Sequence, residues 1–329
     1  MLILKCLLCG RDAQCVEQNY PGYQEPDTFF IYNCAYCNTQ FSYPRVEAKH
    51  IYEIIYEKAE MISGYDRYYN YKNKLKTVEN PLQYLASSEE AYWVIDNALK
   101  QDIGKKDLKI LECGCGMGYL TYSLHKAGFN AIGLDISQNA VSEATKNFGE
   151  LYVCANVFEY AMQHKEEYDR IILTQVIEHI EEPIKWLETL LAMLKKGGKI
   201  ILSTENKTIY PKNAIWQTDL PPIHIWWFSE KSFEYIAGKI NASINFTDFS
   251  KYISNKQFIG IGKVPYNRHR LDKNGNVIPA QQNKLNSLLS DITRKISFIR
   301  YICYRFNKYY IWFGKRRWIM GVTFEKRYN

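Results

Sequence analysis

Residues 108–120, Leu-Lys-Ile-Leu-Glu-Cys-Gly-Cys-Gly-Met-Gly-Tyr-Leu, decide the fold class of this chain of 329 residues. A short apolar run leads into three glycines at alternate positions, and a helical pattern then extends from Tyr119 to Ala127. A strand, a glycine-rich loop and a helix in this order form the unit that binds nucleotide-like ligands in α/β proteins. Tyr119 stands where the dinucleotide fingerprint needs a glycine, which favours a compact zwitterionic ligand over a pyrophosphate.

The following residues repeat the same alternation of strand and helix. A helix is expected from Pro183 to Lys195, ended by Gly197-Gly198, and another from Ser229 to about Ile240. With the strand at 108–111, the remaining strand-like runs bring the total to seven: 131–135, 151–155, 168–174, 199–203, 243–249 and 257–264. This order predicts an α/β fold whose parallel sheet has helices on both faces and binds its ligand at the carboxyl ends of the strands.

Polar residues follow the ends of the first three predicted strands. Glu112 ends the first strand and can accept a hydrogen bond from an ammonium group. Asp135 ends the second strand, where a carboxylate can hold both hydroxyls of a ribose. Asn156 and Val157 close the third strand, where an adenine edge would lie.

In combination these motifs resemble those of class I S-adenosylmethionine-dependent methyltransferases. The resemblance covers about residues 105–265, and the run Gln175-Val-Ile-Glu-His-Ile is similar to the branch that contains the ubiquinone-biosynthesis O-methyltransferases. It implies a seven-stranded Rossmann-like sheet with an antiparallel final strand, and S-adenosyl-L-methionine (SAM) as cofactor. It also implies cofactor contacts at Glu112, Gly114, Gly116, Gly118, Asp135, Ile136, Asn156, Val157 and Thr174.

Two histidines are candidates for the acceptor side of such a site. Methyl transfer needs the acceptor atom aligned with the methyl group, and a hydroxyl acceptor must also lose a proton. Glu178 and His179 follow the fourth predicted strand, and His224 lies in the proline- and tryptophan-containing loop 219–228. We interpret these three residues as catalytic candidates, and either histidine can be the general base or can only orient its loop.

Four of the nine cysteines form two matched pairs near the amino terminus. Cys6 and Cys9 precede Gly10, and Cys34 and Cys37 precede Asn38. Two Cys-x-x-Cys turns can place four thiolates around one zinc ion, and such a closed site leaves no position for a substrate. The spacing therefore predicts a structural zinc-ribbon-like module with ligands Cys6, Cys9, Cys34 and Cys37.

Charge is concentrated at the carboxyl-terminal end. The chain has a net charge of +7, and residues 281–329 contain eleven Lys or Arg against two acidic residues. Aromatic residues interleave with these cations, as in Trp312 and Trp318. A peripheral contact with anionic membrane, a docked helix and an RNA contact are the alternatives for this tail, of which nucleic acid is the least favoured.

These features divide the chain into four parts: a zinc-ribbon-like module at 1–45, a helical bridge or lid at 46–104, a SAM-binding domain at 105–270, and a linker with a basic, helical tail at 271–329. Tyrosines in 64–71 can line a ligand pocket or attach a helix to the core. The apolar start ends at Lys5, and no run is long enough to span a membrane, so we expect a cytoplasmic protein, with a membrane contact only at its surface.

The predicted function is SAM-dependent O-methylation of a saccharide or another hydroxylated small molecule. The zinc module also resembles those of sugar C-methyltransferases and of certain ribosomal RNA guanine methyltransferases. A nucleotide-sugar C-methyltransferase is therefore an alternative, and a SAM-binding adaptor without catalytic activity is a second one.

Overall fold

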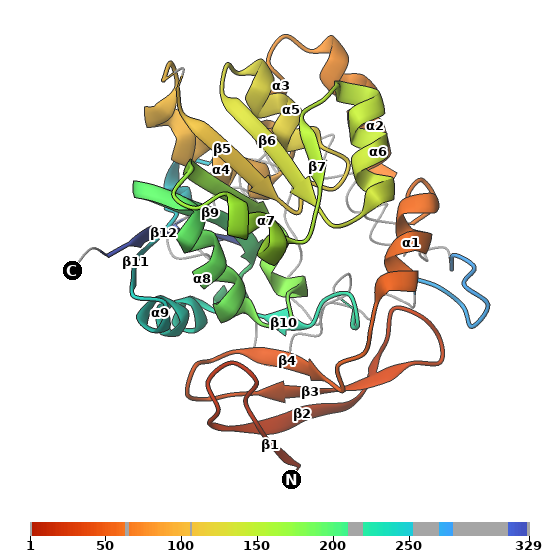
Figure 1. The fold of residues 1–329 in the computed structure, drawn as a ribbon. Coiled ribbons are helices and arrows are strands. Elements are labelled where there is room, and N and C mark those ends of the chain that lie inside the picture. The colour runs from red at the N-terminus through yellow and green to blue at the C-terminus, as the bar shows by residue number, and fades with distance from the viewer. Residues whose placement is uncertain are drawn as a thin grey trace, which may run out of the picture.

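The described residues of the chain form two sheets (Figure 1). The computed structural model describes residues 2–62, 66–105, 107–209, 220–252, 270–278 and 315–327. The larger sheet has seven strands in the order β11-β12-β9-β8-β5-β6-β7. The smaller sheet has five strands in the order β1-β2-β3-β4-β10.

The larger sheet is mainly parallel. Its strand β5 pairs in parallel with β6 and β8, which in turn pair in parallel with β7 and β9. Ile171, Ile172 and Leu173 of β8 are consecutive and fully buried, as expected for a strand covered on both faces. The strands are β5 (Lys109–Cys113), β6 (Asn130–Asp135), β7 (Tyr152–Cys154), β8 (Tyr168–Thr174), β9 (Leu194–Glu205), β11 (Ala242–Phe246) and β12 (Ile319–Lys326). The predicted α/β class with a seven-stranded Rossmann-like sheet is confirmed.

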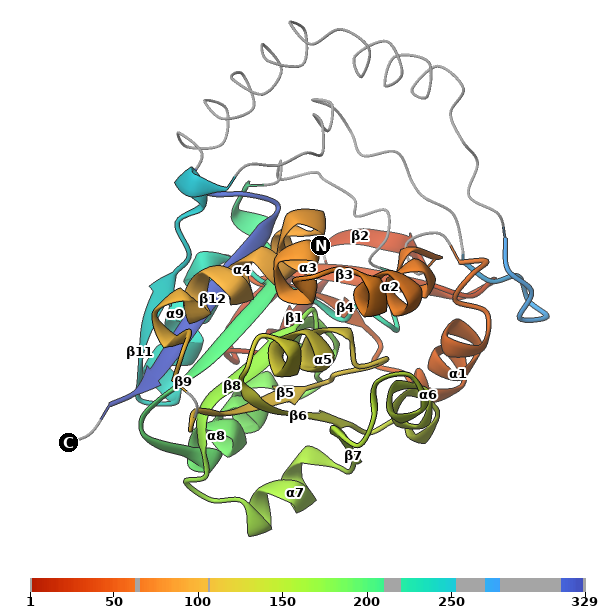
Figure 2. The same cartoon turned by 90° about the horizontal axis from the view of Figure 1, so that it is seen from above.

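The final strand comes from a different segment than the one predicted. The predicted strand 257–264 lies outside the described residues, and β12 pairs antiparallel with both β9 and β11 (Figure 2). Met320, Val322 and Phe324 alternate along β12 and are almost fully buried. Residues 319–326 therefore belong to this sheet, which corrects the predicted domain end at 270 and the assignment of all of 271–329 to a linker and tail.

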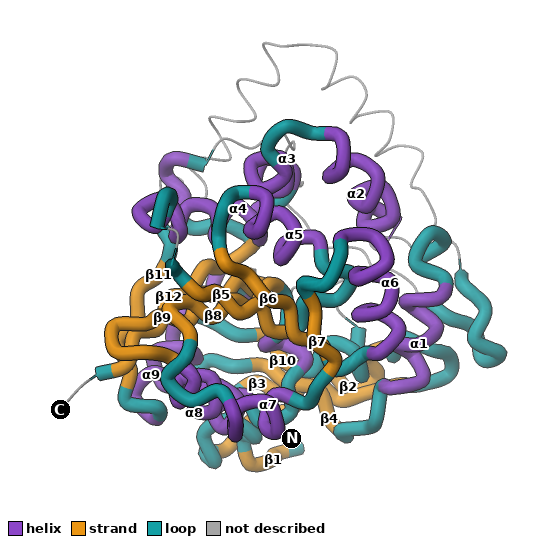
Figure 3. Tube along the Cα trace, turned by 45° about the horizontal axis from the view of Figure 1, so that its top comes forward, coloured by secondary structure: helices purple, strands orange, loops and turns teal. Residues whose placement is uncertain are grey.

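Helices cover both faces of the larger sheet (Figure 3). One buried cluster joins Ile110, Ile172 and Ile201 to the helices α2–α5, and a second joins Leu111, Ile171 and other strand residues to α7–α9. The helices are α1 (Lys49–Glu57), α2 (Asp66–Thr77), α3 (Pro81–Ser88), α4 (Glu90–Leu99), α5 (Tyr119–Lys126), α6 (Gln138–Phe148), α7 (Val157–Gln163), α8 (Pro183–Met193) and α9 (Glu230–Lys239). Among the described residues, no helix combines the length and apolarity that a membrane crossing requires.

The smaller sheet is antiparallel and combines two distant parts of the chain. Its strands are β1 (Ile3–Lys5), β2 (Asp12–Pro21), β3 (Thr28–Asn33), β4 (Gln40–Tyr43) and β10 (Trp226–Trp227). Trp226 pairs with Phe41, and Trp227 pairs with Gln40. The amino-terminal module therefore shares its sheet with the loop that contains His224.

Part of the basic tail lies against the body of the protein. Arg317 forms an ion pair with Glu90 of α4 at 2.7 Å, and Arg316 forms one with Glu230 of α9. The Arg317 guanidinium also lies 5.0 Å from the ring centre of Tyr252. These two cations are engaged within the protein, and residues 281–314, which hold most of the predicted tail, lie outside the described residues.

Candidate active site

The glycine loop between β5 and α5 has a backbone that only glycines fit. Gly114 and Gly118 both have left-handed φ angles, +74° and +79°. A Cβ atom on Gly114 would lie 2.6 Å from Cγ2 of Val176, and one on Gly118 would lie 2.5 Å from the ring of Tyr152. Backbone angle and space therefore both require glycine at these two positions.

Asp135 lies at the end of β6 beside this loop. Its carboxylate accepts hydrogen bonds from the Gly116 N–H at 2.8 Å and from the Ser137 N–H at 2.9 Å. The side chain is buried, which raises its pKa, although these N–H bonds oppose the rise. The loop and the strand end thus hold one carboxylate in a fixed orientation, and its predicted contact with ribose hydroxyls remains a prediction.

Glu112 lies deeper than expected. The hydroxyl of Thr121, on α5, donates a hydrogen bond of 2.5 Å to Oε2 of Glu112, which is 4% exposed. Burial raises the pKa of Glu112 to about 8. The carboxyl group therefore joins β5 to α5 beneath the loop, and an ammonium ligand would have to reach it there. The sequence contained no signal for Thr121 as its partner.

The remaining predicted cofactor contacts lie around the same edge of the sheet. Oδ1 of Asn156 accepts a hydrogen bond of 2.9 Å from the N–H of Phe158 and so caps α7, whose first residue is Val157. Ile136 is 73% exposed, which is unusual for an apolar side chain after a buried strand. Thr174 ends β8, and its buried hydroxyl has no hydrogen-bond partner among the described residues. An exposed apolar side chain and an unsatisfied hydroxyl at one edge are suited to contact a bound ligand.

His179 and His224 meet beside the end of β8. His179 belongs to the short 3-10 helix η2 (Ile177–His179), and its ring centre lies 4.4 Å from that of His224, with the planes nearly perpendicular. Nδ1 of His179 lies 2.7 Å from the carbonyl oxygen of Ile223. Because a carbonyl can only accept, this contact assigns the proton to Nδ1 and leaves a lone pair on Nε2.

Glu178 completes the cluster of catalytic candidates. It is 1% exposed and accepts a hydrogen bond of 2.9 Å from the Thr204 hydroxyl. One carboxylate oxygen of Glu178 and one ring nitrogen each of His179 and His224 all lie within 4.8 Å of one another. Burial lowers the pKa of His224 to about 3, and the positive charge of Arg270 contributes to this decrease. The ring of His224 is therefore neutral near pH 7. The structure thus brings the three predicted residues together, and their catalytic roles remain predictions.

Helix α1 adds two tyrosines that the sequence pattern did not single out. The ring of Tyr52 meets that of His179 edge-on at 6.2 Å. The hydroxyl of Tyr56 lies 3.9 Å from where a Cβ on Gly116 would be. In contrast, Tyr71, from the stretch predicted to line a pocket or attach a helix, is buried against Glu89 and Tyr84. The side chains of 63–69 lie outside the described residues.

The four cysteines of the amino-terminal module form a group that can hold a metal ion. The sulfurs of Cys6 and Cys37 are 3.7 Å apart, and those of Cys9 and Cys34 are 3.5 Å apart. Tetrahedral coordination by thiolates predicts sulfurs about 3.8 Å apart. The residues after each pair, Gly10 and Asn38, have φ angles of +73° and +56°, the turn that such a site needs. The residues present therefore fit a four-thiolate metal centre.

The cysteine module contacts the segment that carries His224. The N–H of Ser42 and the guanidinium of Arg45 both donate to the carbonyl oxygen of Ile225, at 3.2 Å and 3.0 Å. The same guanidinium lies 4.4 Å from the ring centre of Trp226. On its other side, the N–H of Ile225 donates to the backbone carbonyl of Glu178. The loop is thus fixed between β4 and the residues after β8.

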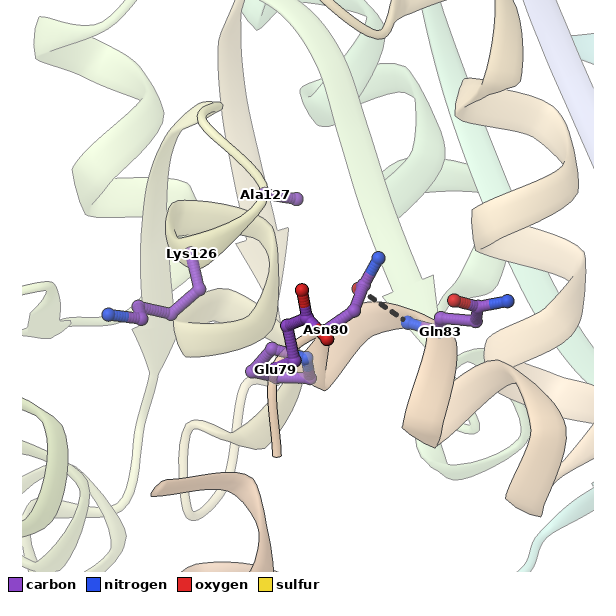
Figure 4. A pocket seen from close by; sticks show the side chains of 6 residues that line it. Glu79, Asn80, Gln83, Lys126 and Ala127 are labelled. Atoms are coloured by element: carbon purple, nitrogen blue, oxygen red, sulfur yellow. Dashed lines mark hydrogen bonds between the residues drawn. The ribbon is translucent and has the colours of Figure 1, made fainter. Parts of the chain in front are cut away.

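A separate recess of about 390 Å³ lies away from these residues (Figure 4). It is lined at the start of α3 and the end of α5 by Glu79, Asn80, Pro81, Gln83, Lys126 and Ala127. The glycine loop precedes the opposite end of α5, so this recess is not part of the candidate site. Its polar lining includes Asn80, whose side chain accepts from the Gln83 N–H at 3.0 Å and so caps α3.

Comparisons with known proteins agree with the central motifs. Residues 87–244 match the family model of a methyltransferase domain. The chain is similar to the ubiquinone biosynthesis O-methyltransferases of Aliivibrio fischeri strain ES114, with 31% identity over 106 residues, and of Aromatoleum aromaticum, with 29% over 120 residues. These matches cover 31% and 35% of this chain and 45% and 49% of those proteins. The chain therefore spans about half the length of the curated relatives that it matches.

A solved structure is also similar to this chain. The SAM-dependent methyltransferase from Archaeoglobus fulgidus is 14% identical, with a TM-score of 0.44, over 79% of this chain and 99% of that one.

Proposed function

Because the chain contains a class I S-adenosylmethionine-dependent methyltransferase domain, whose family model matches residues 87–244, we propose that it transfers the methyl group of SAM to a hydroxyl oxygen of a small acceptor, with His179 as the general base. The single observation that carries this proposal is the hydrogen bond from Nδ1 of His179 to the carbonyl oxygen of Ile223. The proton on Nδ1 makes Nε2 the basic nitrogen of the neutral ring, and a proton transferred to it from the acceptor hydroxyl would make His179 an imidazolium next to Glu178.

The residues at the carboxyl edge of the sheet fit SAM. When bound, SAM supplies a methyl group on a positively charged sulfur. Asp135 would hold the ribose hydroxyls, Gly114, Gly116 and Gly118 would allow close approach of the backbone, and Ile136 and Val157 would flank the adenine. Glu112, beneath the loop, would attract the ammonium group, and the Thr174 hydroxyl would face the cofactor.

The acceptor in this proposal is a hydroxylated small molecule, with saccharides as the first class to test. The relatives are O-methyltransferases of ubiquinone biosynthesis, which supports oxygen as the acceptor atom. Trp226 and Trp227 are 1% and 2% exposed, so they pack in the interior and offer no open face to a sugar ring. The aromatic ring beside His179 is that of Tyr52. Phenolic acceptors are therefore tested together with saccharides.

We assign zinc to the four cysteines. Cys6, Cys9, Cys34 and Cys37 would bind it as thiolates, and the hydrogen bond with the Cys6 thiol lowers the pKa of Cys37 below that of an ordinary thiol. Zinc in a closed four-thiolate site supplies structural cross-linking. The second cysteine pair directly precedes β4, which pairs with β10, so zinc would help to hold the loop of His224 in place.

Calorimetric titration with SAM tests the proposal. We expect the metal-loaded chain to bind SAM, the Asp135→Ala variant to lose binding by at least about 10-fold through lost charge-assisted hydrogen bonds, and Asp12→Ala, an exposed aspartate in β2, to bind as the wild type does. Failure of the folded, metal-loaded chain to bind SAM would reject the proposal.

The acceptor class is tested next with tritiated SAM and panels of saccharides and phenols. Transfer of label, followed by a methoxyl signal in the NMR spectrum of the product, would establish O-methylation. A new carbon-bound methyl signal would instead establish the C-methyltransferase alternative. SAM binding without transfer to any panel member would favour the adaptor alternative.

A further inference from the structure

Helix α1 presents a different kind of side chain on each of two faces. Ile51 and Ile55, one turn apart, are fully buried against residues of the smaller sheet, including Ile31 and Trp227. Residues one turn apart lie on one face of a helix, so Tyr52 and Tyr56 share a neighbouring face. The buried isoleucines fix the helix, which stands next to α6 (Figures 1 and 2), and so fix where the two tyrosines point.

The two tyrosines lie over the two halves of the candidate site. Tyr56 is next to the glycine loop, at Gly116, and the ring of Tyr52 is next to His179. Burial raises the pKa of Tyr52, and the carboxylates of Glu178 and Asp135 raise it further. The Tyr52 hydroxyl therefore interacts electrostatically with Asp135, proposed to hold the ribose, and with Glu178, on the acceptor side.

We propose that the ring of Tyr52 faces the sulfonium of bound SAM and makes the site prefer the charged cofactor to its neutral product, S-adenosylhomocysteine (SAH). The inference rests on the proposed function, because it takes Asp135 as the ribose contact and His179 as the acceptor-side base. The methyl-bearing sulfur would then lie between these two residues, and the ring of Tyr52 lies beside one of them, His179.

The preference follows from the charge of the ligand. The face of an aromatic ring is electron-rich and attracts a cation, most strongly where water is excluded. SAM carries a positive sulfur and SAH a neutral thioether, so a contact with the ring stabilises the complex with SAM selectively. Because SAH lacks this contact, it should bind less tightly than SAM and dissociate more readily after transfer.

The ratio of the dissociation constants of SAH and SAM, measured by calorimetry on the metal-loaded chain, tests the inference without any need for an acceptor. We expect Tyr52→Leu to weaken SAM binding about 2- to 30-fold more than SAH binding. Tyr52→Phe keeps the ring and should keep the ratio of the wild type. The matched control is Tyr43→Leu, a partly exposed tyrosine in β4 of the smaller sheet.

Fluorinated phenylalanines at position 52 keep the test valid if Tyr52→Leu does not fold. Each added fluorine withdraws electron density from the ring with little change of shape, so SAM affinity should fall stepwise while SAH affinity stays constant. An equal loss for both ligands, or no dependence on fluorine number, would overturn the inference and leave the proposed function intact. A wild-type chain that binds neither ligand would overturn both.

Discussion

The hydroxyl of Thr39 donates a 2.7 Å hydrogen bond to the hydroxyl of Ser232, both fully buried. Thr39 follows the second cysteine pair, and Ser232 is in the first turn of α9, where it forms a capping box with Ser229. Ser232 also donates to the carbonyl oxygen of Cys37 at 3.1 Å, and Lys207 donates to the side chain of Asn38 at 2.8 Å. The turn that contains Cys37 is therefore hydrogen-bonded directly to the methyltransferase domain.

Loss of the proposed zinc ion should loosen the loop of His224. Without zinc the turn at Cys37 loses its cross-link, and β4, which follows it, holds Trp226 and Trp227 less firmly. In Cys34→Ser we expect amide hydrogen exchange in 224–228 to accelerate about 10-fold, equal to about 1.4 kcal/mol of lost local stability. Exchange in β5 and β6 should remain as in the wild type.

The control for this experiment is Cys15→Ser, because Cys15 lies in β2 outside the four-cysteine group. This variant should keep both its metal and the slow exchange of 224–228. If Cys34→Ser lost its metal and 224–228 still exchanged slowly, the module and the loop would be energetically independent.

Replacing Gly118 by alanine separates backbone strain from crowding. Gly118 and Gly128 have φ angles of +79° and +91°, but only at Gly118 would a Cβ collide with a neighbour, the ring of Tyr152. We expect Gly128→Ala to cost about 1 kcal/mol of unfolding free energy, from left-handed strain alone. Gly118→Ala should cost a further 1–3 kcal/mol or so, and should weaken SAM binding, because the loop must move.

Urea unfolding measures the stability of both alanine variants, and calorimetry measures their SAM affinity. The double variant Gly118→Ala, Tyr152→Ala removes the colliding ring and should recover part of the lost affinity. Equal stability losses at the two glycines would show that the close approach of Tyr152 has no energetic weight.

Local sequence patterns were sufficient for the central part of the fold. The strand, glycine loop and helix around Gly114 involve neighbours in sequence, and so do the cysteine pairs, so spacing alone identifies them. The catalytic candidates Glu178, His179 and His224, named from separate parts of the sequence, lie close together, and their roles remain predictions. Glu178 and His179 are adjacent in the chain, and the sequence motif that contains them follows a predicted strand.

Long-range pairing could not be predicted in the same way. A strand pattern gives propensity but not its partner, so 257–264 was as suitable for the last strand as 319–326, which pairs with β9. A long insertion between paired strands costs little extra entropy, so chain distance does not exclude such a partner. The sequence also did not indicate that Trp226 and Trp227 pair with β4, which buries them. The role proposed for Tyr52 depends on the placement of α1, which the sequence pattern did not indicate.

Acid should destabilise the protein through His224. In the unfolded chain this histidine has an ordinary pKa of 6.5, whereas in the folded protein burial, helped by Arg270, lowers its pKa to about 3. Below pH 6.5 the unfolded chain therefore binds a proton that the folded protein does not bind. The free energy of unfolding must fall as the pH is lowered from 6.5 towards 3, by up to about 1.4 kcal/mol per pH unit.

Urea unfolding at pH 7 and pH 4.5 tests this. Relative to His224→Gln, the wild type should lose about 2.5 kcal/mol between the two pH values. His125→Gln, an exposed histidine at the end of α5, should follow the wild type. Parallel pH dependence in His224→Gln and the wild type would show that His224 is protonated in the folded protein as readily as in the unfolded chain.

The two histidines should respond differently to substitution by asparagine once an acceptor is known. The amide nitrogen of asparagine can take the place of Nδ1 of His179 and still donate to the carbonyl oxygen of Ile223, but it provides no equivalent of Nε2. His179→Asn should therefore preserve the conformation of the loop that contains Ile223 and the affinity for SAM. It should lower kcat by about 100- to 10,000-fold. The pH dependence of kcat that reflects the base should disappear as well. In His224→Asn the base remains, so we expect a rise in KM and a smaller effect on kcat. If instead His224→Asn removed the pH dependence and His179→Asn kept it, His224 would be the base and the bond to Ile223 would only hold the loop.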